Sequence, residues 1–152
     1  MNPMREHNER TLDTLIPQLE LTHGRDVALG EASRWTCISH INRLVEQGVD
    51  VNCVIGERRV TPLMMAGKKE AAKCLLELGA NVNATDTDGH TALMWVFVQR
   101  FRRRESLARV KLLLEYGADV SLRDAIGNTA YDYALKRSDA VAADLLLPPK
   151  VR

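Results

Sequence analysis

An eight-residue phrase recurs along this chain of 152 residues, and it constrains the fold more than any other feature. Residues 75–82 read LLELGANV and residues 113–120 read LLEYGADV, while residues 44–51, LVEQGVDV, form a fainter copy. Phrases that recur every ~20–50 residues are typical of proteins built by stacking one small structural unit. Because such stacks present long binding surfaces, the pattern predicts a protein that holds another macromolecule.

Each phrase reads as the end of a helix that is followed by a connector. Leucines on one face give way to a glycine, which adopts the left-handed conformation that closes a helix at low cost. Turn-forming residues follow, and a threonine then stands where its side chain can cap the next helix. The glycines are Gly48, Gly79 and Gly117, and the threonines are Thr61, Thr91 and Thr129. The predicted unit is therefore helix, turn, helix, glycine and hairpin-like connector.

The opening and the close of this unit resemble the ankyrin repeat. Residues 61–66, TPLMMA, are similar to that family's Thr-Pro-Leu-His-x-Ala opening, and the recurring phrase is similar to its close. Residues 127–134, GNTAYDYA, are similar to terminal repeats of the family, and residues 27–32 to a degenerate opening. The resemblance covers about residues 24–147. It implies an all-α helical repeat solenoid of about four repeats with hairpin-like connectors.

Three features depart from the family's pattern. The opening histidine is replaced by Gly30, Met64, Met94 and Asp132. We therefore expect the usual threonine–histidine hydrogen bonding to be absent and the stack to be less rigid. The second repeat is about three residues short, which predicts a pinched turn at residues 67–69. The third repeat is about five residues longer than usual, and the added residues lie within residues 96–106. Such insertions usually lie on the surface.

The predicted organisation is an N-terminal helical cap, four repeats and a short tail. Apolar residues recur at helical spacing, so residues 8–20 are expected to form an amphipathic helix that Pro17 kinks or shortens. This helix is expected to cover the apolar side of the first repeat, with partner binding as the alternative. The cap is residues 1–23 and the tail is residues 148–152. The repeats fill residues 24–147, at about residues 24–55, 56–84, 85–122 and 123–147.

Net charge, cysteine content and the lack of long apolar segments indicate which partners and which cell compartment to expect. The net charge is +1, so no global field indicates a nucleic-acid or membrane partner. The three cysteines share no metal-ligand spacing and read as small core residues of a reduced compartment. No secretory signal or transmembrane stretch is evident. We expect a cytoplasmic protein, although an effector with a non-standard export signal would look the same.

Motifs that carry chemistry are missing from the sequence. It has no phosphate-binding glycine loop, no His-x-x-x-His pair and no Gly-x-Ser-x-Gly. Cys37 and His40 are three residues apart, but no third group orients them for catalysis. Asp86 and Asp88 read as turn formers, while His90 contacts either a ligand or solvent. We expect no enzyme, no cofactor, no metal and no small-molecule substrate.

Basic and aromatic residues are the best candidates for a binding surface. Aligned repeats place cations near the end of each first helix, and in proteins that resemble this one these positions and the connector tips line a concave face. Cations near helix ends also favour the helix dipole and solvent without any partner, which is the alternative. The candidate partner-binding residues are Arg34, Trp35, Arg58, Arg59, Lys68, Lys69, His90, Trp95, Arg100, Phe101, Arg102, Arg103, Arg104, Lys136 and Arg137.

Two kinds of aromatic position stand out. Trp35 lies beside Arg34 and is expected to be exposed, as tryptophan and arginine are favoured interface anchors. Trp95 and Tyr133 occupy matching positions, where packing between repeats explains them equally well. These residues favour a non-catalytic module that binds a partner protein with an acidic surface, as a small inhibitor, an antitoxin-like immunity factor or an adaptor. The alternative is nucleic-acid binding through the same basic stripe, which the near-neutral charge disfavours.

Overall fold

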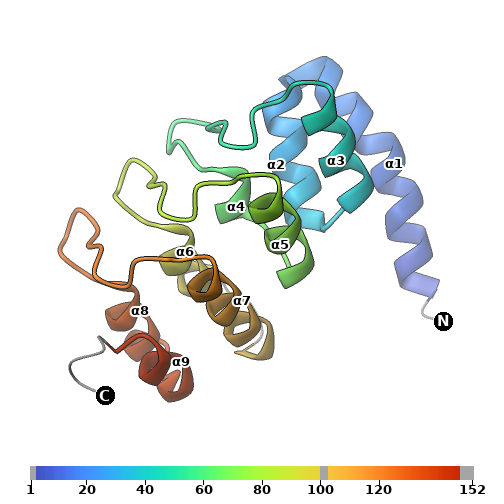
Figure 1. Ribbon diagram of the computed structural model, residues 1–152. Helices are drawn as coiled ribbons and strands as arrows, with labels where there is room; N and C mark the ends of the chain where they lie inside the picture. Colours follow the sequence, from blue (N-terminus) through green and yellow to red (C-terminus); the bar gives the residue numbers. More distant parts are fainter. Residues whose placement is uncertain (1–2, 100–102, 148–152) are drawn as a thin grey trace. The chain divides into compact units, whose positions relative to one another are not determined.

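The computed structural model describes residues 3–99 and 103–147, and within these ranges the chain forms nine helices and no strand. This confirms the predicted all-α fold. The helices are α1 (Pro3–His23), α2 (Arg25–Trp35), α3 (Ile38–Glu46), α4 (Pro62–Met65), α5 (Lys69–Glu77), α6 (Ala92–Val98), α7 (Arg103–Glu115), α8 (Ala130–Lys136) and α9 (Ala140–Leu145). Long connectors precede α4, α6 and α8 (Figure 1).

The chain divides into two compact units that alternate along the sequence. Unit 1 comprises Met1–Ile55 and Thr61–Ala80, and unit 2 comprises Gly56–Val60 and Asn81–Arg152. Helices α1 to α5 therefore belong to unit 1, and α6 to α9 belong to unit 2. The short segment Gly56–Val60 is the exception to chain order, because it packs with the later unit although it precedes α4.

Both units stack helix pairs in the same way. In unit 1, the first helix α2 packs on α4 and the second helix α3 packs on α5. In unit 2, α6 packs on α8 and α7 packs on α9. The recurring phrase supplies the core of these contacts, because Leu44, Leu75 and Leu113 are all buried. The helical period thus places one leucine of each phrase against its neighbours.

Helix α1 is longer than the sequence predicted. It runs unbroken from Pro3 to His23, and Pro17 lies inside it without ending it. A proline inside a helix removes one backbone hydrogen bond and costs about 3 kcal/mol or more. Helix α1 packs along α2 and buries Leu12 and Ile16. Burying two such side chains stabilises by about 3–6 kcal/mol, which offsets the cost of the proline.

The threonine caps form as predicted, although the histidine of the family is missing. Thr61, Thr91 and Thr129 each accept a hydrogen bond from the backbone N–H three residues later, at 3.3–3.4 Å. In the last repeat another side chain supplies the bonding that the histidine would make. There Asp132 takes the place of histidine, and its carboxylate accepts from both the backbone N–H and the hydroxyl of Thr129 at 2.8 Å.

The two length changes are absorbed in different helices. In the short repeat, α4 has four residues and Gly67 donates its N–H to the carbonyl of Ser33 at 3.1 Å, which confirms the pinched turn. A Cβ at Gly67 would collide with the Arg34 carbonyl oxygen, so only glycine fits there. In the long repeat, α7 has 13 residues where α3 and α5 have nine. The insertion therefore lengthens a second helix.

Candidate protein-binding surface

Two connectors of unit 2 are built around a buried aspartate. The Oδ1 atom of Asp86 accepts the backbone N–H groups of Asp88 and His90 at 3.0 and 2.8 Å. Asp124 does the same for Ile126 and Asn128 at 3.0 and 2.8 Å. Aspartate closes turns in this way because its short side chain reaches the backbone two residues ahead. The interpretation of Asp86 as a turn former is confirmed.

Successive connectors of unit 2 are joined by backbone hydrogen bonds. Thr87 donates its N–H to the carbonyl of Arg58 at 3.0 Å, and Ala125 donates to the carbonyl of Asp88 at 2.8 Å. Gly89 makes this approach possible, because a Cβ there would lie 3.1 Å from the Ala125 nitrogen and its φ is +79°. The side chains carried by the three connectors are therefore held in a fixed register.

The second oxygen of each aspartate binds an aromatic side chain from the following helix. The indole N–H of Trp95 donates to Asp86 Oδ2 at 3.0 Å, and the hydroxyl of Tyr133 donates to Asp124 Oδ2 at 2.7 Å. His90 links the two pairs: its Nδ1 lies 3.2 Å from Asp86 Oδ2 and its Nε2 lies 3.0 Å from the Tyr133 oxygen. One continuous hydrogen-bond network thus joins two connectors and two helices.

Electrostatics in this network favours ionised carboxylates. Burial alone would raise the pKa of Asp86 and of Asp124, but the hydrogen bonds that each accepts outweigh burial and lower both pKa values. Burial, together with the hydrogen bond and the charge of Asp124, raises the pKa of Tyr133 to about 12. The tyrosine therefore stays a neutral donor facing an anionic acceptor, which is a strong hydrogen-bond arrangement.

Two cations lie over the aromatic rings of this network. The Arg58 guanidinium is 5.1 Å from the Trp95 ring centroid, and its Nη2 is 3.1 Å from Asp88 Oδ2. The Lys136 ammonium is 5.1 Å from the Tyr133 ring centroid. Cation–π contacts at this distance are attractive by about 0.5–1 kcal/mol at exposed sites. We call Arg58, His90, Trp95, Tyr133 and Lys136 the unit 2 face.

The unit 2 face brings together four of the predicted site residues: Arg58, His90, Trp95 and Lys136. The two ring nitrogens of His90 contact Asp86 and Tyr133, and contact of His90 with a partner stays a prediction. The hydrogen bond of Tyr133 to Asp124 was not predicted. The signal that could have found the turn is Asp-x-x-Gly-x-Thr, which occurs at residues 86–91 and 124–129.

The remaining predicted cations of unit 2 lie apart from this network. Arg59 is exposed at a connector tip with a φ of +53°, and Arg137 is exposed at the end of α8. Arg104 is exposed on α7. Arg100, Phe101 and Arg102 lie outside the described residues, as does the side chain of Arg103, so the insertion stays a prediction.

In unit 1, four predicted site residues form a second exposed group. Arg34 and Trp35 end α2, and the hydrogen bond from Gly67 to Ser33 brings Lys68 and Lys69 beside them. We call Arg34, Trp35, Lys68 and Lys69 the unit 1 cluster. The Trp35 side chain is 49% exposed, as predicted, and its indole N–H donates to Glu31 at 3.1 Å. Lys68 and Lys69 begin α5 instead of ending the first helix, because α4 stops at Met65.

Two further groups of chemically reactive side chains lie in the described part of the chain. Cys37 precedes α3, and His40, three residues later, lies 3.8 Å from Asp13. Asp86, Asp88 and His90 each place one possible metal-ligand atom within 4.8 Å of the others. Three N–H donors already occupy the Asp86 oxygens, and the His90 Nδ1 atom and the Arg58 guanidinium lie 3.2 and 3.6 Å from Oδ2. A metal ion would have to compete with all of them.

The helix pairs, threonine caps and joined connectors define a stacked helical-repeat protein. Comparison with known families agrees: the family described as Ankyrin repeats (3 copies) matches residues 29–124 and 63–151. The chain belongs to the ankyrin-repeat family. Repeats of this family mediate protein–protein interactions and are typically non-catalytic. Among the described residues, no helix is both long enough and apolar enough to cross a membrane.

One similar curated protein is the phosphocholine transferase AnkX of Legionella pneumophila, strain Philadelphia 1. The two sequences are 33% identical over 76 residues, which is 48% of this chain and 8% of that protein. The chain therefore spans only a small fraction of the relative's length. The similarity is to its repeats and carries no catalytic function with it.

Proposed function

We propose that the protein binds a partner protein through the unit 2 face and the unit 1 cluster, without catalysing a reaction. The observation that carries this proposal is the pairing of Arg58 with Trp95 and of Lys136 with Tyr133. Each pair holds a charged group at the surface on a half-buried aromatic ring. Ordering such long side chains before binding reduces the entropy lost when a partner arrives.

The partner that fits this surface is a protein with an acidic patch. Arg58, Lys136 and their exposed neighbours Arg59 and Arg137 supply positive charge at one set of connectors and helix ends. Trp35 adds an exposed aromatic ring among three cations in unit 1. Tryptophan and arginine are the residues most enriched among interface anchors, and complementary charge speeds association.

We propose that binding itself is the biological activity. The described residues consist of repeats and α1, so occupying a partner's functional surface is the action that they support. A small inhibitor, an antitoxin-like immunity factor or an adaptor works in this way. The transferase activity in the name of the relative AnkX is not proposed for this chain, because the match covers 8% of that protein.

The test is capture of partners on the immobilised full chain, followed by kinetics with the protein that is captured. Arg58→Ser with Lys136→Ser should weaken binding by about tenfold or more and flatten its dependence on salt. The matched control is Arg25→Ser with Lys111→Ser, which removes the same charge from exposed positions outside the face. Equal binding by both double variants would contradict the proposal, and tight binding of generic duplex DNA would favour a nucleic-acid function.

A further inference from the structure

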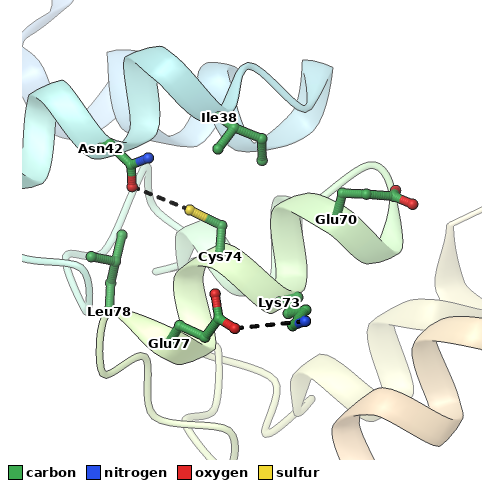
Figure 2. Close-up of a pocket in the computed structure, with 7 residues that line it drawn as sticks. All are labelled: Ile38, Asn42, Glu70, Lys73, Cys74, Glu77 and Leu78. Atoms are coloured by element: carbon green, nitrogen blue, oxygen red, sulfur yellow. Dashed lines mark hydrogen bonds and ion pairs between the residues drawn. The ribbon is translucent and has the colours of Figure 1, made fainter.

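A groove of about 340 Å³ lies between α3 and α5, the second helices of unit 1. Ile38 and Asn42 of α3 face Cys74 across it, and Leu78 closes one end (Figure 2). Glu70 and Glu77 line its α5 side together with Lys73. The groove therefore combines an apolar floor with an acidic rim.

The sequence explains why the groove is hollow. Cys74 immediately precedes the phrase of the second repeat, where the third repeat has Leu112 before its own phrase. Leu112 is 2% exposed and fills its place, whereas the smaller Cys74 side chain is half-buried and lines open space. Its thiol donates to the amide oxygen of Asn42 at 3.4 Å. Substitution of leucine by cysteine at one repeat position thus leaves room beside an exposed leucine, Leu78.

The floor of the groove stays uncharged. Burial, and then the charge of Glu77, raise the pKa of the Cys74 thiol, so the sulfur remains a neutral and weakly polar group. Ile38, Cys74 and Leu78 together offer a surface that favours an aliphatic side chain. Burial of one such side chain stabilises a complex by removing apolar surface from water.

The rim carries net negative charge. The Lys73 ammonium lies 3.7 Å from a Glu77 oxygen, one turn away on the same helix, and both side chains are exposed, so the pair is a weak one that leaves Glu77 open to a further cation. Glu70 makes no ion pair with the described residues. Two carboxylates against one lysine select a cationic occupant and disfavour an anionic one.

We propose that this groove is a second docking site, which binds a basic peptide segment that presents an aliphatic side chain between lysines or arginines. The aliphatic side chain occupies the space beside Cys74, and the flanking cations pair with Glu70 and Glu77. This occupant is opposite in charge to the acidic partner of the unit 2 face. The two surfaces therefore take different ligands, and each proposal can fail without the other.

The test uses the full chain labelled with ¹⁵N and the peptide acetyl-Lys-Lys-Leu-Lys-Lys-amide, followed by amide chemical shifts. Saturable shifts should concentrate on α3 and α5. The same peptide with alanine in place of leucine should bind more weakly, and acetyl-Glu-Glu-Leu-Glu-Glu-amide should not bind. Shifts that spread along the chain, or that are equal for the leucine and alanine peptides, would overturn the proposal, because simple charge attraction explains them.

Variants locate the site. Cys74→Leu, which copies the third repeat, should remove binding while spectra elsewhere stay unchanged. Glu77→Gln should weaken binding by up to about fivefold, as expected for an exposed ion pair, whereas Glu115→Gln at the matching place in the third repeat should not. If Cys74→Leu fails to fold, the two glutamate variants decide, and equal effects from them overturn the proposal. Sedimentation could also show a dimer that becomes monomeric in Cys74→Leu. The groove would then bind a second copy of this chain, and the proposal would be overturned.

Discussion

Replacing Asp86 by asparagine should expose how strongly the connector network depends on one carboxylate. The Asp86 side chain is fully buried, accepts three N–H donors and lies 3.2 Å from the Nδ1 atom of His90. Asparagine keeps the Oδ1 acceptor that closes the turn, so the backbone of the connector is retained. Its amide group, however, presents N–H donors to the Trp95 indole N–H, which is itself a donor.

The size of the effect follows from the bonds that are lost. A hydrogen bond to a charged group contributes about 1.5–3 kcal/mol, and a buried donor without an acceptor costs about 1–3 kcal/mol. Asp86→Asn removes the charged acceptor of Trp95 and weakens the contact with His90. We therefore expect the free energy of unfolding to fall by about 2–4 kcal/mol.

Asp88→Asn is the matched control, because it makes the same chemical change two residues further along the turn. Asp88 has a side chain that is 56% exposed and one ion pair with Arg58 at 3.1 Å. Exposed ion pairs contribute about 0–1 kcal/mol, so this variant should unfold almost like the original protein. Urea unfolding of both variants, followed by circular dichroism, makes the comparison. Equal stability of the two would refute the role assigned to Asp86.

The difference between the original protein and Asp86→Asn should also depend on pH. Because the folded-state pKa of Asp86 is lowered, its stabilising contribution is complete above the unfolded-state pKa of about 3.9. It is lost as the pH falls through the folded-state pKa. Asp124, whose pKa is also lowered, is present in both proteins and cancels in the difference. The two unfolding curves should therefore converge in acid, and a constant separation would contradict the assignment.

Three further outcomes are expected. Leu76→Ala and Leu113→Ala should each lower the free energy of unfolding by about 2–5 kcal/mol in urea melts, since both side chains are buried. Tyr133→Phe should cost about 1–3 kcal/mol, because Asp124 loses a donor at 2.7 Å; an unchanged melting temperature would contradict this. Trp35→Ala should weaken partner binding by about 2 kcal/mol, mostly through faster dissociation, with little change in melting temperature. A loss of stability with intact binding would show that Trp35 is a packing residue.

The helix caps and helix ends could be predicted from the sequence because they depend on neighbouring residues. Gly79 and Gly117 close helices with φ values of +95° and +82°, and Thr91 caps α6. These choices follow from backbone sterics and from hydrogen bonds that span three or four residues. The same local rules misjudged α1, because the packing of α1 on α2 outweighs the effect of Pro17.

The candidate site was predicted only in part. The sequence identified the cations and tryptophans, but not what holds them. The contact between Arg58 and Trp95 and the hydrogen bond between His90 and Tyr133 join residues that are far apart along the chain. Such pairs depend on how connectors stack, and no pattern within one repeat reveals them. The turn that precedes α5 likewise depends on a distant group, because Gly67 donates its N–H to the carbonyl of Ser33.

The alternation of the two units along the chain restricts how this protein can be divided. Gly56–Val60 belongs to unit 2 but precedes Thr61–Ala80, which belongs to unit 1. No single cut can release both units intact. A fragment that begins at Thr61 lacks Arg58 of unit 2, and a fragment that begins at Gly56 also contains α4 and α5 of unit 1. Genetic recombination at one crossover point meets the same obstacle.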